Sequence, residues 1–145
     1  MLDFLKNALD NAKKMVDQKM NQSVAEGAMA VAASVAAADG KIDDSELDAV
    51  HEIITNEDTL KNQDTDVLCE LFDKYAKSMG SPLKRRSVQK AIDGLKSRSD
   101  EEKEFAFLVG YEIAAADGNV DDDEKATLQK VATNIGVNYN KLMNS

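Results

Sequence analysis

Apolar side chains recur every three to four residues along most of this chain, a spacing typical of amphipathic α-helices. No stretch alternates strictly between apolar and polar positions, as a half-buried strand would. One proline and seven glycines among 145 residues also favour helices. This length suits one domain with a sizeable core and is too short for two ordinary domains. We therefore predict an all-α fold, a compact single-domain bundle of seven to eight helices over residues 1–145.

The N-terminal segment, residues 1–22, contains the first expected helix, at residues 3–20. Its apolar stripe comprises Leu2, Leu5, Leu9, Ala12 and Val16, and lysine and aspartate are mixed on the other side. Such a helix is expected to pack on the core. The alternative is an arm that docks on a membrane surface or on a partner protein.

Capping residues mark the ends of the other helices. The second begins at Ser23, with Glu26 completing a capping box, and the third covers about Ser45–Asn56. A polar loop, Asn56–Asp66, precedes a fourth helix, whose apolar face comprises Val67, Leu68, Leu71, Phe72 and Tyr75. Ser81 and Pro82 start a fifth, with Leu83, Val88, Ile92 and Leu95 facing inwards. A sixth is capped by Ser99 and Glu102, a seventh runs from about Asp122 to Ile135 and ends at Gly136, and a short turn covers Asn138–Asn144.

The chain contains one sequence pattern twice. Residues 114–124 (AAADGNVDDDE) repeat residues 36–46 (AAADGKIDDSE) at an offset of 78 residues. The similarity continues outwards, since Val31 aligns with Val109 and Val50 with Leu128. We therefore predict two pseudo-symmetric halves, each a duplicated helix–corner–helix unit, at residues 24–56 and 102–136.

Each repeated corner has the pattern of a helix start. Asp43 is followed three residues later by Glu46, and Asp121 by Glu124, which is the spacing of a capping box. Ile42 and Val120 precede the caps and fit a hydrophobic staple. Helix capping is therefore one complete explanation of these four acids.

Capping does not explain Asp39 and Asp117. Each lies at the expected end of an apolar helix, where a negative charge meets the negative end of the macrodipole at a cost of about 0.3–1 kcal/mol. A bound cation would turn this cost into a gain. Because carboxylate and carbonyl oxygens are hard ligands, calcium or magnesium is expected rather than zinc. The candidate metal ligands are Asp39, Asp43, Glu46, Asp117, Asp121 and Glu124, and no organic cofactor is expected.

An EF-hand loop is the obvious rival to this interpretation. With Gly40 at the sixth position, Glu46 falls at the twelfth, as in an EF-hand. Positions one and three are then Val35 and Ala37, which carry no ligand oxygen in their side chains. Any cation site at these corners would therefore be a half-loop.

No catalytic motif is evident in the sequence: there is no phosphate loop, no Gly-x-Ser-x-Gly and no zinc signature. Cys69 has no second cysteine with which to pair, and we expect it to be buried and inert. His51, the one histidine, is expected at the surface or at the edge of the core.

The net charge of −9 argues against a nucleic-acid partner. Residues 81–99 carry six basic residues and one acid, so this segment has a net charge of +5 and the rest of the chain −14. The ordinary interpretation of the basic residues is a solvated helix face; the sharper one is a docking surface for an acidic partner or for anionic lipid headgroups.

Charged residues interrupt residues 1–22 throughout, so this segment does not have the pattern of a secretory signal. The apolar run at residues 27–38 is shorter than the about 20 residues that a membrane span needs. We expect a cytoplasmic protein.

The apolar helix ending in Ala-Ala-Asp-Gly, the Asp and Glu spaced after it and the second copy of this pattern resemble the tellurite-resistance TerB family. The resemblance covers about residues 27–136. It implies a small all-helical cytoplasmic protein without catalytic activity, with an acidic face that binds divalent metal. It also implies partners among other tellurite-resistance proteins, including the integral membrane protein TerC, at the inner face of the membrane.

The sequence thus predicts a non-enzymatic tellurite-resistance or stress-response protein that binds a divalent cation at its acidic corners and couples protein partners at the membrane. The alternative is an acidic adaptor or scaffold that needs no metal. A third candidate, a metal-assisted hydrolase, would require a deep pocket between the corners.

Overall fold

The computed structural model describes residues 21–38, 42–57, 60, 62–115 and 120–143, and within these residues all regular elements are helices. They are α3 (Gln22–Ala36), α4 (Asp44–Asn56), α5 (Thr65–Ser78), α6 (Arg85–Asp93), α7 (Asp100–Ala114), α8 (Asp122–Ile135) and α9 (Tyr139–Met143). This confirms the all-α prediction. The helix expected at residues 3–20 lies outside the described residues, and the pseudo-symmetry of the two halves stays a prediction.

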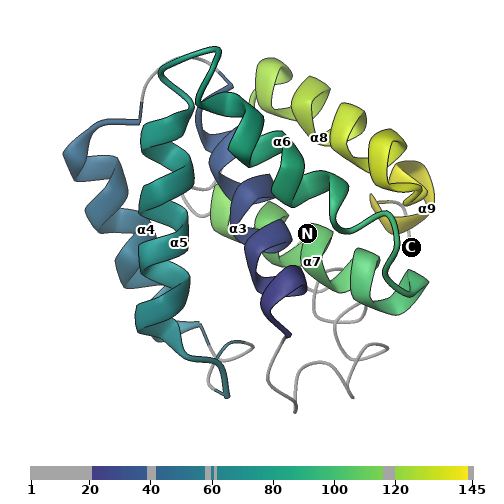
Figure 1. The fold of residues 1–145 in the computed structure, drawn as a ribbon, viewed down its shortest axis with the longest axis horizontal. Helices are drawn as coiled ribbons and strands as arrows, with labels where there is room; N and C mark the ends of the chain where they lie inside the picture. Colours follow the sequence, from purple (N-terminus) through teal and green to yellow (C-terminus); the bar gives the residue numbers. More distant parts are fainter. Residues whose placement is uncertain (1–20, 39–41, 58–59, 61, 116–119, 144–145) are drawn as a thin grey trace.

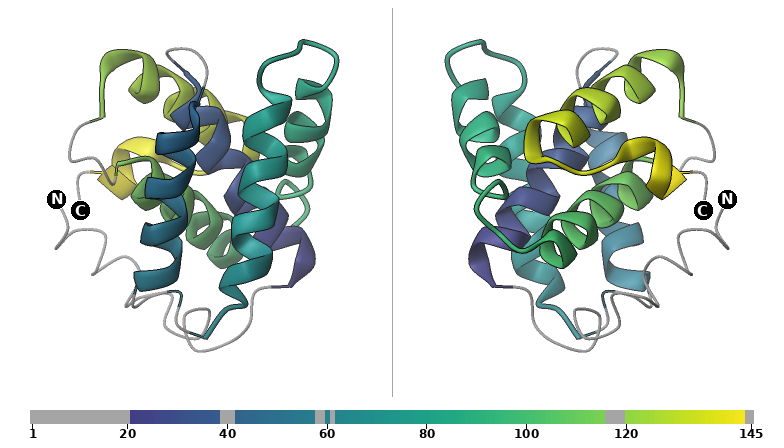
Figure 2. Two further views of the ribbon diagram at one scale, coloured as in Figure 1. Left: turned by 90° about the vertical axis from the view of Figure 1, so that its left-hand side faces the viewer. Right: turned by 90° about the vertical axis from the view of Figure 1, so that its right-hand side faces the viewer.

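Helix α3 is the centre of the bundle (Figures 1 and 2). It packs against α5, α6, α7 and α8. A helix in contact with neighbours on several sides needs apolar residues around most of its circumference. The sequence supplies them, because ten of the fifteen residues of α3, from Val24 to Val35, are buried. Its alanines and glycine keep the helix thin, which lets the neighbouring helices approach closely.

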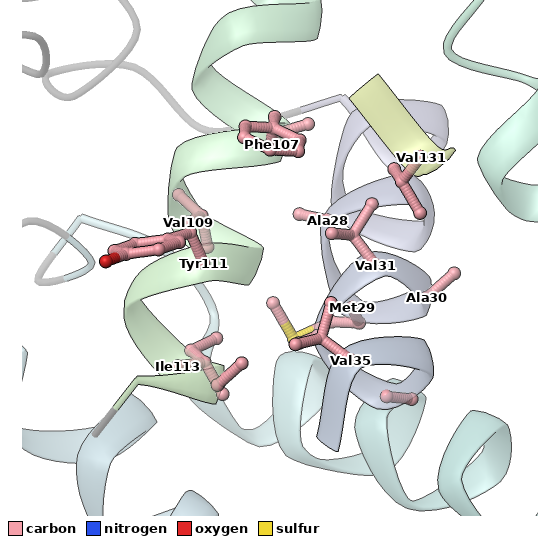
Figure 3. Close-up of a cluster of buried hydrophobic side chains, with 14 of the residues drawn as sticks. Ala28, Met29, Ala30, Val31, Val35, Phe107, Val109, Tyr111, Ile113 and Val131 are labelled. Carbon is pink, nitrogen blue, oxygen red and sulfur yellow. The ribbon is translucent and has the colours of Figure 1, made fainter. Parts of the chain in front are cut away.

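The closest partner of α3 is α7, which buries an unbroken run from Phe105 to Tyr111. In Figure 3, α3 and α7 lie side by side, and Met29, Val35 and Ile113 approach one another. Gly110 lies at the crossing point. A Cβ atom on Gly110 would lie 2.6 Å from Cγ1 of Val31 and 3.1 Å from the carbonyl oxygen of Ala28. Only glycine therefore fits between the two helices at this point.

The start of α3 differs from the prediction. Asn21, not Ser23, is the N-cap: its side-chain oxygen accepts a hydrogen bond from the backbone N–H of Val24 at 2.9 Å. Glu26 accepts a hydrogen bond from the side chain of Gln22 instead of completing a box with Ser23. Asparagine and serine cap equally well, so residue type alone does not choose between them.

The start of α6 was also predicted wrongly. Residues 81–84 form turns, and the helix begins at Arg85 with no side-chain cap. Val88, Ile92 and Leu95 are buried as predicted, but Leu83 is 72 % exposed. Because residues 82–84 are turn rather than helix, Leu83 does not continue the buried stripe of α6. On α5, Val67 was likewise expected inside and is 45 % exposed.

The C-terminal half follows the predicted boundaries. Ser99 and Glu102 form a capping box at the start of α7. Helix α8 ends at Gly136, whose φ of 83° lies in the left-handed region that favours glycine. The short helix α9 then lies against the core through the buried Leu142.

Gly110→Ala tests the close contact of α3 and α7. The added methyl group must push against both Val31 and the backbone of Ala28, so we expect a loss of about 1–3 kcal/mol in unfolding free energy, despite the better helix propensity of alanine. Chemical denaturation measures this. Gly80→Ala is the control, because its Cβ would lie no closer than 3.7 Å to the carbonyl oxygen of Lys77. Equal stability of Gly110→Ala and wild type would contradict the packing described.

Candidate functional site

The first acidic corner is the start of α4. Asp43 is the N-cap; its Oδ1 accepts hydrogen bonds from the backbone N–H of Glu46 at 2.8 Å and from Oγ of Ser45 at 2.7 Å. In the reciprocal hydrogen bond, Oε1 of Glu46 accepts from the backbone N–H of Asp43 at 3.3 Å. The predicted capping box is therefore present. Ile42, just before the cap, is half-buried against the core, as a staple residue should be.

These hydrogen bonds stabilise the charged form of Asp43. The backbone N–H of Glu46, and after it the hydroxyl of Ser45, hold the pKa of the Asp43 carboxyl below its ordinary value. The positive end of the α4 macrodipole favours the same charge. The first corner is thus a fixed negative charge on an exposed surface.

The second acidic corner, at the start of α8, has the same geometry. Oδ1 of Asp121 accepts from the backbone N–H of Glu124 at 2.8 Å, and Oε1 of Glu124 accepts from the backbone N–H of Asp121 at 3.0 Å. The corners differ in burial. Glu124 is only 8 % exposed and is the one buried charged residue within the described part of the chain, whereas Glu46 is exposed.

The structure does not gather the six candidate ligands into one described site. It pairs Asp43 with Glu46 and Asp121 with Glu124, while Asp39 and Asp117 lie outside the described residues. Helix α4 packs mainly against α5, and α8 mainly against α3. Among the residues that the structure covers, no three His, Cys, Asp or Glu side chains lie close enough together to hold a metal ion. Capping therefore accounts for the four described acids as they stand.

A carboxyl pair that the sequence analysis did not identify joins α7 to the end of α4. Glu112, a half-buried residue on α7, forms a side-chain hydrogen bond with Glu57, the C-cap residue of α4. Burial, and then the charge and hydrogen bond of Glu57, raise the pKa of Glu112 to about 7. A glutamate inside the apolar run of residues 105–115 was the available signal for an unusual carboxyl.

His51 and Cys69 lie along the contact between α4 and α5. Nε2 of His51 is 2.6 Å from Oδ1 of Asp73, so these residues link the two helices at a partly exposed position. Burial, and then the negative charge of Asp73, raise the pKa of the Cys69 thiol. A raised pKa disfavours the reactive thiolate, in line with the inert role expected for this cysteine, but Cys69 is only partly buried, so the predicted burial is wrong.

Comparison with protein-family models matches residues 25–144 to the family described as tellurite resistance protein TerB. The chain belongs to the TerB family. Neither the curated proteins nor the solved structures gave a match. The match begins in the first turn of α3 and covers every later helix, so the TerB domain includes both acidic corners. None of the helices described in this TerB chain has the length and apolar character needed to cross a bilayer.

The Glu112–Glu57 pair predicts a pH dependence. The pKa of Glu112 in the folded protein, about 7, lies above its ordinary value of 4.5, so the folded state binds this proton more tightly than the unfolded state. The resulting stability is complete below pH 4.5 and is lost as the pH rises through 7. We therefore expect Glu112→Gln to gain stability relative to wild type between pH 5 and pH 8, measured by urea unfolding. Glu52→Gln, on the exposed side of α4, is the control. A stability difference between Glu112→Gln and wild type that does not change with pH would contradict the shared proton.

Proposed function

We propose that this TerB chain is a non-enzymatic coupling protein of a tellurite-resistance or stress-response system, which holds partner proteins through charged surfaces. The observation that carries the proposal is the separation of charge among the helix starts. The first turns of α4 and α8 carry exposed carboxylates, including Asp44 and Asp122, whereas α6 starts with exposed basic residues. Such segregated charge steers and orients partners more than it stabilises a fold.

The partners proposed are other tellurite-resistance proteins, with the membrane protein TerC among them. The chain would meet TerC as a cytoplasmic protein at the inner face of the membrane. Membership of the TerB family supports this assignment. In this proposal the acidic corners are the recognition surface, because their carboxylates are held in place by the capping boxes and do not lose much side-chain freedom on binding.

Divalent-cation binding is the second candidate function. The observation in its favour is that both corners carry the same Asp–Glu pair in the same geometry. Asp39 and Asp117 precede these pairs by four positions in the sequence. Calcium or magnesium would take carboxylate oxygens from these residues. The four described acids are already explained by capping, so the proposed cation site depends on Asp39 and Asp117 as additional ligands. The charged adaptor therefore ranks first.

The double variant Asp43→Asn/Asp121→Asn separates these roles from capping. Asparagine caps as well as aspartate, so the variant should fold and unfold much like wild type, within about 1–2 kcal/mol. It loses two negative charges that both proposals require. Asp100→Asn/Glu101→Gln, at the exposed first turn of α7, removes two charges away from the corners and is the matched control.

Two calorimetric titrations give the outcomes. For the adaptor we expect the double variant to bind detergent-solubilised TerC about tenfold more weakly than wild type and the control, with or without a chelator. For the cation site we expect heat when calcium is added to wild type and the control, none with the double variant, and TerC binding that the chelator weakens. Unchanged TerC affinity in the double variant would contradict the adaptor, and no heat at millimolar calcium would contradict the cation site.

A further inference from the structure

The basic surface of α6 is the strongest feature that the proposed function leaves without a ligand. It consists of Lys84, Arg85, Arg86 and Lys90, all exposed. The ion pairs formed by residues 81–99 within the described structure are Lys96–Asp93 and Arg98–Glu102, so none of these four cations has a carboxylate partner there. Figure 1 shows α6 crossing in front of α3, with its outer side uncovered by any other described helix.

Three of these cations, Lys84, Arg85 and Arg86, do not help α6 to form, whereas Lys90 lies in the last turn, where the macrodipole favours a cation. Lys84 is the N-cap and makes no side-chain capping bond, and the first turn contains no acid. Arg85 and Arg86 there face the positive end of the macrodipole, which disfavours cations. Helices α4, α7 and α8 begin with the opposite arrangement, acidic first turns and capping boxes. The positive charge at the start of α6 therefore has no stabilising role within the described fold.

An exposed leucine adjoins the charges. Leu83 is 72 % exposed in the turn before α6, directly before Lys84, and is the most exposed large hydrophobic residue in the described part of the chain. A nucleic acid backbone, or a peptide of acidic residues alone, would pair with the cations and leave this side chain in water. A bilayer surface accommodates both, since phosphates receive the cations and the boundary of the acyl chains receives the leucine.

A groove lined by residues of α3, α5 and α6 continues the basic surface. It has a volume of about 350 Å³, and the side chains of Lys74, Lys90, Ser23 and Ser87 line it, together with one carboxylate, Glu26. Lys74 and Lys90 line this groove from different helices, α5 and α6. A lipid headgroup phosphate in this groove would be favoured by the two lysine charges and by the hydroxyl of Ser23, whereas the hydroxyl of Ser87 already donates to the backbone carbonyl of Lys84 at 2.9 Å.

The remaining charge of the protein fixes the orientation. Residues 81–99 carry a net charge of +5 within a chain of net charge −9, so the rest of the chain carries −14 and is on average repelled by an anionic membrane. We infer that Leu83, Lys84, Arg85, Arg86 and Lys90 form a docking surface for a bilayer that contains anionic phospholipids. This inference extends the proposed coupling role to the membrane itself, and it can be tested with lipid alone, so its outcome is independent of any protein partner.

Co-sedimentation of the full chain with vesicles tests the docking surface. We expect binding to vesicles of phosphatidylcholine with 30 % phosphatidylglycerol, no binding to pure phosphatidylcholine, and loss of binding as salt is raised. Arg86→Gln/Lys90→Gln should weaken binding about tenfold or more, since each cation near an anionic surface adds roughly 1 kcal/mol. Leu83→Ser should weaken it without any change in charge.

The control is Lys125→Gln/Lys130→Gln, which removes two exposed cations from α8 and should bind like wild type. Thermal unfolding followed by circular dichroism verifies that each variant is folded. Three results would overturn the inference: no binding of wild type to anionic vesicles, equal weakening by the α6 and α8 double variants, or wild-type binding by Leu83→Ser. Failure here would leave the TerC titration unaffected, and the reverse also holds.

Discussion

The burial of α3 on several sides is the constraint on which the rest of the structure depends. Because α3 contacts α5, α6, α7 and α8, its sequence must be small and apolar around most of its surface. Two glycines set the closest approaches: Gly110 of α7 against Val31, and Gly27 of α3, where a Cβ would lie 2.5 Å from Leu95. Within the described residues this centre is filled mainly by apolar side chains, so most charged side chains lie at helix ends and on outer faces.

The helix ends then determine how charge is distributed. At α4, α7 and α8 acids occupy the first turns, where backbone N–H groups and the macrodipole stabilise them, so negative charge is both tolerated and fixed in position. Helix α6 has the opposite sign at its start and gains nothing from it. Stability alone explains the acids but not the cations of α6. The cations at the start of α6 therefore have no role in the fold, whereas the fixed acids can serve both the fold and a partner.

Structural features that depend on neighbouring residues could be predicted from the sequence, and contacts between residues far apart in the sequence could not. The capping boxes of Asp43 and Asp121 depend on residues three positions apart, so the amino-acid sequence alone predicts them. The Glu112–Glu57 contact joins residues 55 positions apart, and no local pattern encodes it. The glycine contacts of α3 with α7 and Leu95 are equally non-local.

Two local signals also gave wrong predictions. Ser23 competed with Asn21 as a cap, and Pro82 placed the predicted start of α6 too early, so that Leu83 was expected inside the core. The sites of Asp39 and Asp117 stay predictions.

Native-state hydrogen exchange tests the central position of α3 most directly. If α3 is held by all its neighbours, the amides of Met29 to Ala33 should exchange only when the whole protein unfolds, with protection that matches the global unfolding free energy. The amides of α6, which covers one side of the bundle, should exchange through smaller openings. Protection of α3 no greater than that of α6 would contradict this account, because α3 would then open without the rest of the fold.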